Sequence, residues 1–143
     1  MMPRTIHDQY LETEVFTAGP LKLVCILYRA AIEGVAAARG HLQRGEIRER
    51  SRRISKVLQI LAELRRSLDH THGAAISRNL DGIYAYMQGQ LTHANFAQTD
   101  APLAEVEGLL TNLQEAWLQI VQSEHREVFH EPKDEPAALS CAY

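Results

Sequence analysis

The side chains best suited to chemistry in this sequence are one cysteine in an apolar run and two histidines at a break between helical segments. Cys25 stands between Val24 and Ile26, which supply no base, and apolar burial raises the pKa of a thiol, so Cys25 is poorly placed as a nucleophile. His70 and His72 have no Cys, Asp or Glu cluster around them at metal-ligand spacing. We therefore predict that the protein is not an enzyme and needs no metal or cofactor.

A cluster of basic residues leads into the second helical segment and has two interpretations. Its members are Arg44, Arg48, Arg50, Arg52, Arg53 and Lys56. The cluster is either a docking patch for an acidic partner or nucleic acid, or a solvated helix face. Binding of single strands uses aromatic residues beside the cations, which are missing here, and the formal net charge of the chain is only −3. We favour the solvated face and expect no nucleic-acid partner.

The composition is that of one globular domain in a reducing compartment. The chain has 143 residues, 45% of them apolar, and its two cysteines do not form a disulfide framework. The N-terminus lacks the apolar core of a secretory signal, and no apolar run reaches the length that crosses a membrane. We expect a cytoplasmic protein without membrane insertion.

Four helical segments separated by short breaks make up the middle of the chain. They cover residues 20–43, 46–69 and 74–97, and a fourth stretch from the cap at Asp100 to about Ser123. Each has apolar residues at three- and four-residue spacing, and no segment alternates like a strand. Since short connections join helices of similar length, we predict an all-α fold, an antiparallel up-and-down four-helix bundle.

The inward face of each helix is predicted from its apolar stripe. The stripes are Val24, Tyr28, Ala31, Val35, Ala38 and Leu42; Ile54, Leu58, Leu61, Leu64 and Leu68; Ile76, Leu80, Ile83, Met87, Leu91 and Ala94; and Leu103, Val106, Leu110, Leu113, Trp117 and Ile120. Residues 1–125 form the predicted domain, in which residues 1–16 are a polar docking segment. Residues 126–143, with two prolines and mixed charge, are predicted to be a disordered tail.

Two of the helices have more apolar surface than a small bundle requires, because they are also apolar opposite their inward stripes. The extra faces comprise Leu23, Ile26, Leu27, Ala30, Gly34 and Ala37 on the first helix, and Ala75, Gly82, Ala85 and Gly89 on the third. A glycine inside a helix costs up to about 1 kcal/mol but lets another backbone approach closely. The faces indicate either a partner helix laid in a groove or burial within the bundle and under residues 1–16.

Three sequence segments follow one another in the order and spacing of a known family pattern. The first is Tyr10, followed by Thr17-Ala18-Gly19-Pro20-Leu21-Lys22-Leu23 and then by Leu27-Tyr28. The second is Leu64-Arg65-Arg66-Ser67-Leu68-Asp69. The third runs from Asn79 to Met87 and continues as Leu91-Thr92-His93-Ala94-Asn95. Together these segments resemble the FliS family of flagellin export chaperones. The chain departs from the family pattern at Gly19, at Arg29-Ala30 and at Gly89.

The resemblance implies a four-helix bundle with a mobile N-terminal segment, and a cytoplasmic chaperone that binds the disordered C-terminal region of flagellin. Flagellin would then be kept from premature polymerisation and remain competent for export, with export-gate components as further partners. The partner-binding residues that we expect are Ile6, Tyr10, Leu23, Ile26, Leu27, Ala30, Gly82, Tyr86 and Gly89. The alternative is a helical adaptor or self-associating bundle that uses its extra apolar faces for homodimerisation.

Overall fold

The computed structural model describes residues 20–129, which form four α-helices. The helices are α2 (Pro20–Gln43), α3 (Ile47–Arg66), α4 (Ala74–Ala97) and α5 (Ala101–Phe129). No strand occurs within this part of the chain. The predicted docking segment, residues 1–16, lies outside the described residues, as do residues 130–143 of the predicted tail.

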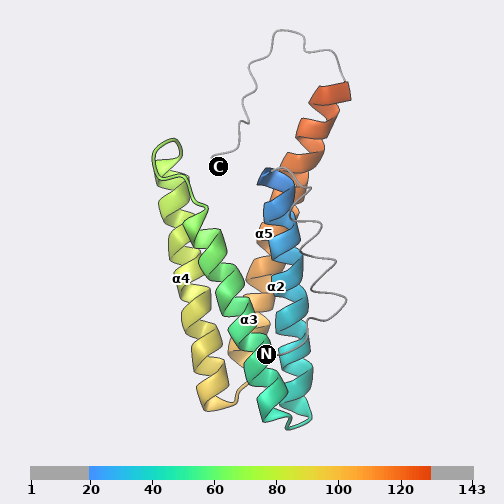
Figure 1. Cartoon of the computed structure of the whole chain (residues 1–143), viewed down its shortest axis with the longest axis vertical. Helices are drawn as coiled ribbons and strands as arrows, with labels where there is room; N and C mark the ends of the chain where they lie inside the picture. Colours follow the sequence, from blue (N-terminus) through green and yellow to red (C-terminus); the bar gives the residue numbers. More distant parts are fainter. Residues whose placement is uncertain (1–19, 130–143) are drawn as a thin grey trace, which may run out of the picture.

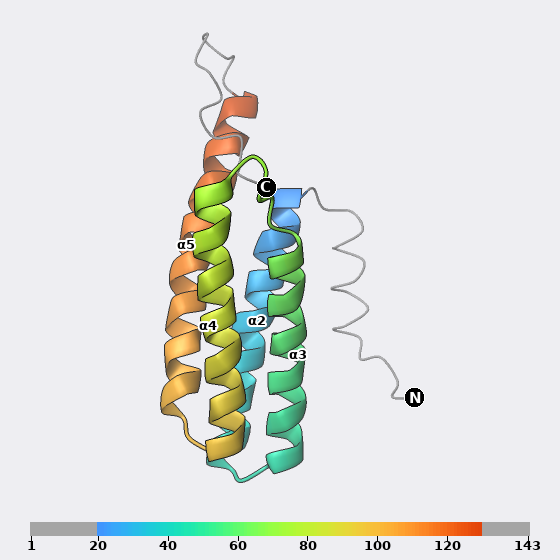
Figure 2. The ribbon, with the colours of Figure 1, turned by 90° about the vertical axis from the view of Figure 1, so that its left-hand side faces the viewer.

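The four helices form an up-and-down bundle, as predicted (Figure 1). Each helix packs against the next along the chain, and α5 returns to pack against α2. The helices α2 and α4 therefore stand at opposite corners, as do α3 and α5, an arrangement that Figure 2 shows from the side. The connection between α2 and α3 turns at Gly45, whose φ of 70° lies in the left-handed region that glycine adopts without strain.

Apolar side chains from all four helices fill the core. Its largest fully buried members include Tyr28 on α2, Leu61 on α3, Tyr84 on α4 and Leu110 on α5. The predicted stripe of α2 is buried except at Leu42, which is partly buried. The three- and four-residue spacing thus placed the inward side of this helix correctly.

The predicted stripe of α4 is wrong at its beginning. Ile76 is 57% exposed, while Ser77 and Tyr84 are fully buried. Burial of these polar side chains is possible because each has a hydrogen bond: Ser77 Oγ donates to the carbonyl oxygen of Asp69 at 2.7 Å, and Tyr84 pairs with Tyr28. The inward side of α4 is therefore rotated relative to its apolar stripe.

Two predicted helix ends also differ from the structure. Helix α3 ends at Arg66 and not at Asp69, because Asp69 instead accepts hydrogen bonds from the backbone N–H groups of Thr71 and His72 in the following turn. Helix α5 continues past the predicted end at Ser123 to Phe129. Residues 126–129 are therefore helical, whereas the sequence pattern placed the start of the tail at residue 126.

Candidate partner-binding surface

The four partner-binding residues predicted on α2 lie on two sides of that helix. Leu23, Leu27 and Ala30 are partly buried, and Leu27 lines a groove between α2 and α3. Ile26 is only 4% exposed and lines a separate groove between α2 and α5. Ile26 is thus buried although it lies opposite the inward stripe of α2, so the expectation that it is exposed on a free outer face is wrong.

The α2/α5 groove has a volume of about 510 Å³ and an apolar floor. Cys25 and Ile26 supply this floor from α2, and Leu118 and Val121 supply it from α5. Leu118 is 41% exposed, so part of its apolar side chain is accessible at the groove. The groove could therefore bury apolar side chains of a partner.

The α2/α3 groove is smaller, at about 380 Å³, and is bordered by charges of both signs. Leu27 and Ile60 lie among its apolar lining residues. Lys56, Glu63 and Arg66 lie along α3 beside them. A partner here would meet a narrow apolar strip between polar side chains.

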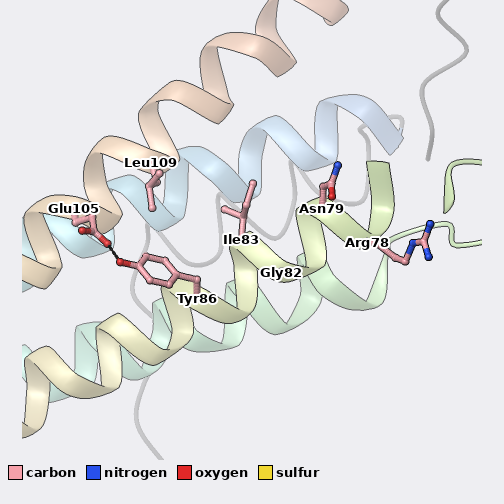
Figure 3. A pocket seen from close by; sticks show the side chains of 7 residues that line it. All are labelled: Arg78, Asn79, Gly82, Ile83, Tyr86, Glu105 and Leu109. Atoms are coloured by element: carbon pink, nitrogen blue, oxygen red, sulfur yellow. Dashed lines mark hydrogen bonds between the residues drawn. The ribbon is translucent and has the colours of Figure 1, made fainter. Parts of the chain in front are cut away.

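The α4/α5 groove is the largest of the three, at about 630 Å³ (Figure 3). Ile83 on α4 and Leu109 on α5 project into the space between the two helices. Tyr86 closes one end, where its hydroxyl donates a hydrogen bond to the carboxylate of Glu105, an interaction that raises the pKa of the tyrosine. Tyr86 remains 50% exposed and is accessible to a partner.

The glycines of α4 lie on its open side, as predicted. A Cβ atom added to Gly82 or Gly89 would meet no heavy atom within 4 Å. Gly34 on α2 is different, since a Cβ there would lie 2.6 Å from Cγ2 of Val57 on α3. The interpretation of Gly34 as part of a free outer face is therefore wrong, because its missing side chain lets α2 and α3 approach each other.

The predicted partner-binding residues do not form one continuous surface. Leu23, Leu27 and Ala30 belong to α2, whereas Gly82, Tyr86 and Gly89 belong to α4 at the opposite corner of the bundle. Ile6 and Tyr10 lie outside the described residues. A single partner that contacts both groups must be long enough to pass around the bundle.

The groups considered for catalysis and metal binding lie on α2 and in the turn between α3 and α4. Cys25 is partly buried, and this burial raises the pKa of its thiol. His70 and His72 are exposed, and His72 Nδ1 lies 2.8 Å from an Asp69 carboxylate oxygen. Among residues 20–129, no group of three or more His, Cys, Asp or Glu side chains could hold a metal ion. None of the helices in this range has an apolar stretch able to span a bilayer.

The basic cluster includes one structural arginine that the sequence pattern did not distinguish from its neighbours. Arg50 is 4% exposed, and its Nε and Nη2 donate to the side-chain and backbone oxygens of Asn95 on α4 at 3.1 and 3.2 Å. Arg44 pairs with Glu46 at 2.7 Å. Arg48 and Arg53 are exposed, as expected for a solvated face.

Comparison with known proteins identifies the family. A family model described as "Flagellar protein FliS" matches residues 2–124. The flagellar secretion chaperone FliSB of Pseudomonas aeruginosa is 35% identical over 107 residues, which cover 75% of this chain and 85% of the relative. The chaperone FliS of Salmonella typhimurium is 35% identical over 111 residues, covering 77% and 82%, and that of Bacillus subtilis is 29% identical over 121 residues, covering 85% and 90%. The chain belongs to the FliS family of flagellar proteins.

Proposed function

We propose that this protein is a cytoplasmic export chaperone that binds the disordered C-terminal region of flagellin. The relatives are named flagellar secretion chaperones, which supports a role in export. The observation that carries the proposal is the presence of apolar grooves on either side of α5, one lined by Ile26 on α2 and the other by Ile83 on α4. No catalytic step is part of this role.

A long disordered client suits separated grooves better than a compact partner does. A flexible chain can wrap around the bundle and place short apolar segments in successive grooves, although ordering the chain lowers its affinity per unit of contact area. Bound in this way, the flagellin segment would be shielded from other flagellin molecules and kept competent for export. Export-gate components would then receive the complex as further partners.

A second candidate function is self-association through the open face of α4. Gly82 and Gly89 leave room for another backbone to approach, and Tyr86 offers exposed aromatic surface beside them. A homodimer could bury this face. The two candidates predict different masses in solution.

Size-exclusion chromatography with light scattering tests both candidates. Export chaperone function predicts a monomer that forms a complex with a flagellin C-terminal fragment. A stable dimer that does not bind the fragment would instead support the helical adaptor.

Titration calorimetry then tests the predicted contact residues. Leu23→Asp and Tyr10→Ala should weaken binding of the flagellin fragment, while thermal melts report whether the bundle stays folded. Leu23 is partly buried, so a melt of the Leu23→Asp variant is essential to the interpretation. Unchanged affinity in both variants would place the client on other surfaces.

A further inference from the structure

Two large apolar side chains are exposed at the end of the bundle opposite to Pro20. Ile47, the first residue of α3, is 57% exposed, and Phe96, in the last turn of α4, is 88% exposed. Figure 1 shows that the turn from α2 to α3 and the turn from α4 to α5 both lie at this end. Neither side chain lines any of the three grooves described above. They are therefore apolar surface that those grooves do not account for.

Hydrogen bonds between α3 and α4 hold both side chains in place. Arg50 Nε and Ser51 Oγ each donate to the side-chain oxygen of Asn95 at 3.1 Å. Phe96 directly follows Asn95, and Ile47 lies one helical turn before Arg50 and Ser51. Since Arg50 is buried, this junction is part of the packed bundle. The two apolar side chains thus stand on helix ends that are fixed to each other.

The same end of the bundle is rich in positive charge, although the chain as a whole is not. Residues 44–56 contain six Lys and Arg and two Glu, while the formal net charge of the chain is −3. The two glutamates pair with Arg44 and Arg52. Arg48 and Arg53 are exposed, and within the described part of the chain neither has an acidic partner. Their charges are therefore available to external anions.

We propose that this end of the bundle contacts the surface of an anionic lipid membrane. We call it the basic end and define it by its exposed side chains Arg44, Ile47, Arg48, Arg52, Arg53 and Phe96. Ile47 and Phe96 would enter the boundary between lipid headgroups and acyl chains, while the arginines bind headgroup phosphates. The contact is peripheral, and no helix spans the bilayer.

A lipid surface fits the basic end better than a folded protein or a nucleic acid does. Anchor side chains of protein interfaces cluster in a packed centre and fill pockets of the partner. Ile47 and Phe96 instead project separately from two helix ends. A headgroup layer accommodates separate apolar side chains without a matching shape. A nucleic acid would use the cations but would leave Ile47 in water.

Membrane contact goes beyond the proposed function, and it is measurable without any client. Its consequence for export does rest on the proposed function. A secretion chaperone attached by its basic end would hold its client beside a membrane while the grooves along the bundle stay open. The cytoplasmic surface of a membrane has the negative potential that this contact requires.

Cosedimentation with vesicles is the first test. The full chain would be mixed with phosphatidylcholine vesicles that contain about one third phosphatidylglycerol, and with pure phosphatidylcholine vesicles. We expect binding to the anionic vesicles in low salt and loss of this binding in high salt, because exposed charges are screened. Equal binding to both kinds of vesicle, or binding to neither, would overturn the inference.

Charge reversal locates the contact on the bundle. The double variant Arg48→Glu with Arg53→Glu should bind anionic vesicles at least about tenfold more weakly than the parent. The matched control is Lys22→Glu with Arg78→Glu, which changes the net charge equally at exposed positions near the starts of α2 and α4, at the opposite end. Its binding should stay within about twofold of the parent, because these positions are far from the contact and screened from it. Thermal melts check that both variants are folded.

Substitution of Phe96 tests the apolar part of the contact. Phe96→Ser should weaken vesicle binding at least about fivefold, because the apolar ring no longer leaves water on binding. Ile76→Ser is the matched control, since Ile76 is also on α4 and is 57% exposed, but at the opposite end of the bundle. Its vesicle binding should stay within about twofold of the parent. Equal losses in the two variants would contradict an oriented contact.

Tryptophan fluorescence reports directly on insertion. Trp117 is the single tryptophan of the chain, so Trp117→Phe provides a silent background in which Phe96→Trp and Ile76→Trp are compared. With anionic vesicles, the emission of Phe96→Trp should move to shorter wavelength and be quenched by lipids brominated in their acyl chains. Ile76→Trp should show neither change. If both tryptophans are quenched equally, the chain adsorbs without orientation and the inference is wrong.

The outcomes separate this inference from the proposed function. If vesicles do not bind and Phe96→Ser instead weakens binding of the flagellin fragment, the basic end is a protein contact. The membrane inference is then overturned, while the chaperone function stands. If the vesicles bind as expected but the flagellin fragment does not, the proposed function fails and the membrane contact stands.

Discussion

The phenolic oxygens of Tyr28 and Tyr84 lie 2.5 Å apart and join the diagonally placed helices α2 and α4 through the centre of the bundle. Both side chains are fully buried, and their ring centroids are 6.3 Å apart. The ring of Trp117 on α5 is tilted by 43° relative to that of Tyr28, and the two ring centroids are 6.5 Å apart. An aromatic cluster with a polar link thus fixes how α4 is rotated relative to α2.

Tyr84→Phe should lower the free energy of unfolding by about 0.5–1.5 kcal/mol, because it removes one buried hydrogen bond while keeping the ring. Urea denaturation of the parent, both single Tyr→Phe variants and the double variant provides a double-mutant cycle. We expect the double variant to lose less than the sum of the single variants, since Tyr28 and Tyr84 share the bond. Strict additivity would mean that the bond contributes little.

The hydrogen bond between Tyr28 and Tyr84 also explains where the prediction of the inward side of α4 from the sequence failed. The apolar stripe that begins at Ile76 places Tyr84 at its flank and not among the inward residues. The spacing of apolar residues does not show that a tyrosine hydroxyl has a buried partner 56 residues away in the chain. On α2, by contrast, aliphatic and small residues dominate the stripe, and the pattern alone identified the buried side.

Leu61→Ala and Leu110→Ala should each destabilise the protein by about 2–5 kcal/mol, because both leucines are fully buried and their removal leaves cavities. Ile76→Ala is the matched control on the misassigned stripe, and its effect should stay within about 0.5 kcal/mol. Chemical denaturation monitored by circular dichroism measures all three. A larger loss at Ile76 than at either leucine would contradict the burial described here.

The candidate surface was only partly predictable, for a related physical reason. Excess apolar character identified α2 and α4 as the helices with more apolar surface than their inward stripes. A groove, however, forms between two helices, so the second helix also has to be known. Leu118 and Leu109, which complete the grooves on α5, belong to a helix that showed no excess apolar face. Which neighbour shares a groove depends on how the helices are placed and rotated relative to one another, and the apolar pattern of one helix does not show this.

Arg65 and Asp81 should make stability depend on pH in the acidic range. Arg65 Nε and Nη2 donate to the two Asp81 carboxylate oxygens at 2.7 and 3.2 Å, and this pairing lowers the pKa of Asp81. The contribution of this ion pair to the free energy of unfolding is fully present at neutral pH. It begins to fall below about pH 4, where the carboxylate of the unfolded chain binds a proton, and it is lost as the pH passes through the lowered pKa of the folded carboxylate. Since both side chains are partly exposed, we expect at most about 1 kcal/mol.

Asp81→Asn isolates this contribution. The parent should be more stable than the variant at pH 7, and the difference should shrink as the pH is lowered in denaturation experiments. A stability difference that stays constant from pH 7 to strongly acidic pH would show that the charge of Asp81 is not its source.

Gly34→Ala should destabilise the bundle although alanine favours helices. The new Cβ would lie 2.6 Å from Cγ2 of Val57, whose short branched side chain is fully buried and has little freedom to move. Overpacking of this kind costs about 1–3 kcal/mol, which exceeds the gain in helix propensity of about 1 kcal/mol. Adding Val57→Ala to Gly34→Ala should recover part of the loss if the clash is its cause, and thermal melts would show this.

Gly82→Leu should stabilise the free protein and weaken client binding at the same time. Nothing lies within 4 Å of an added Cβ at Gly82, so the variant gains helix propensity of up to about 1 kcal/mol without a clash. The leucine side chain would, however, extend beside Ile83 into the α4/α5 groove, where a client helix must approach closely. We therefore expect a higher melting temperature together with a lower affinity for the flagellin fragment.

Gly108→Leu on α5 is the matched control for Gly82→Leu, because an added Cβ there also meets no heavy atom within 4 Å and Gly108 does not line the α4/α5 groove. Both variants should melt at higher temperature than the parent, but only Gly82→Leu should weaken binding in calorimetry. If the two variants bind the fragment equally well, then the leucine at position 82 stabilises the protein without weakening binding. The client would then not lie on the open glycine face of α4.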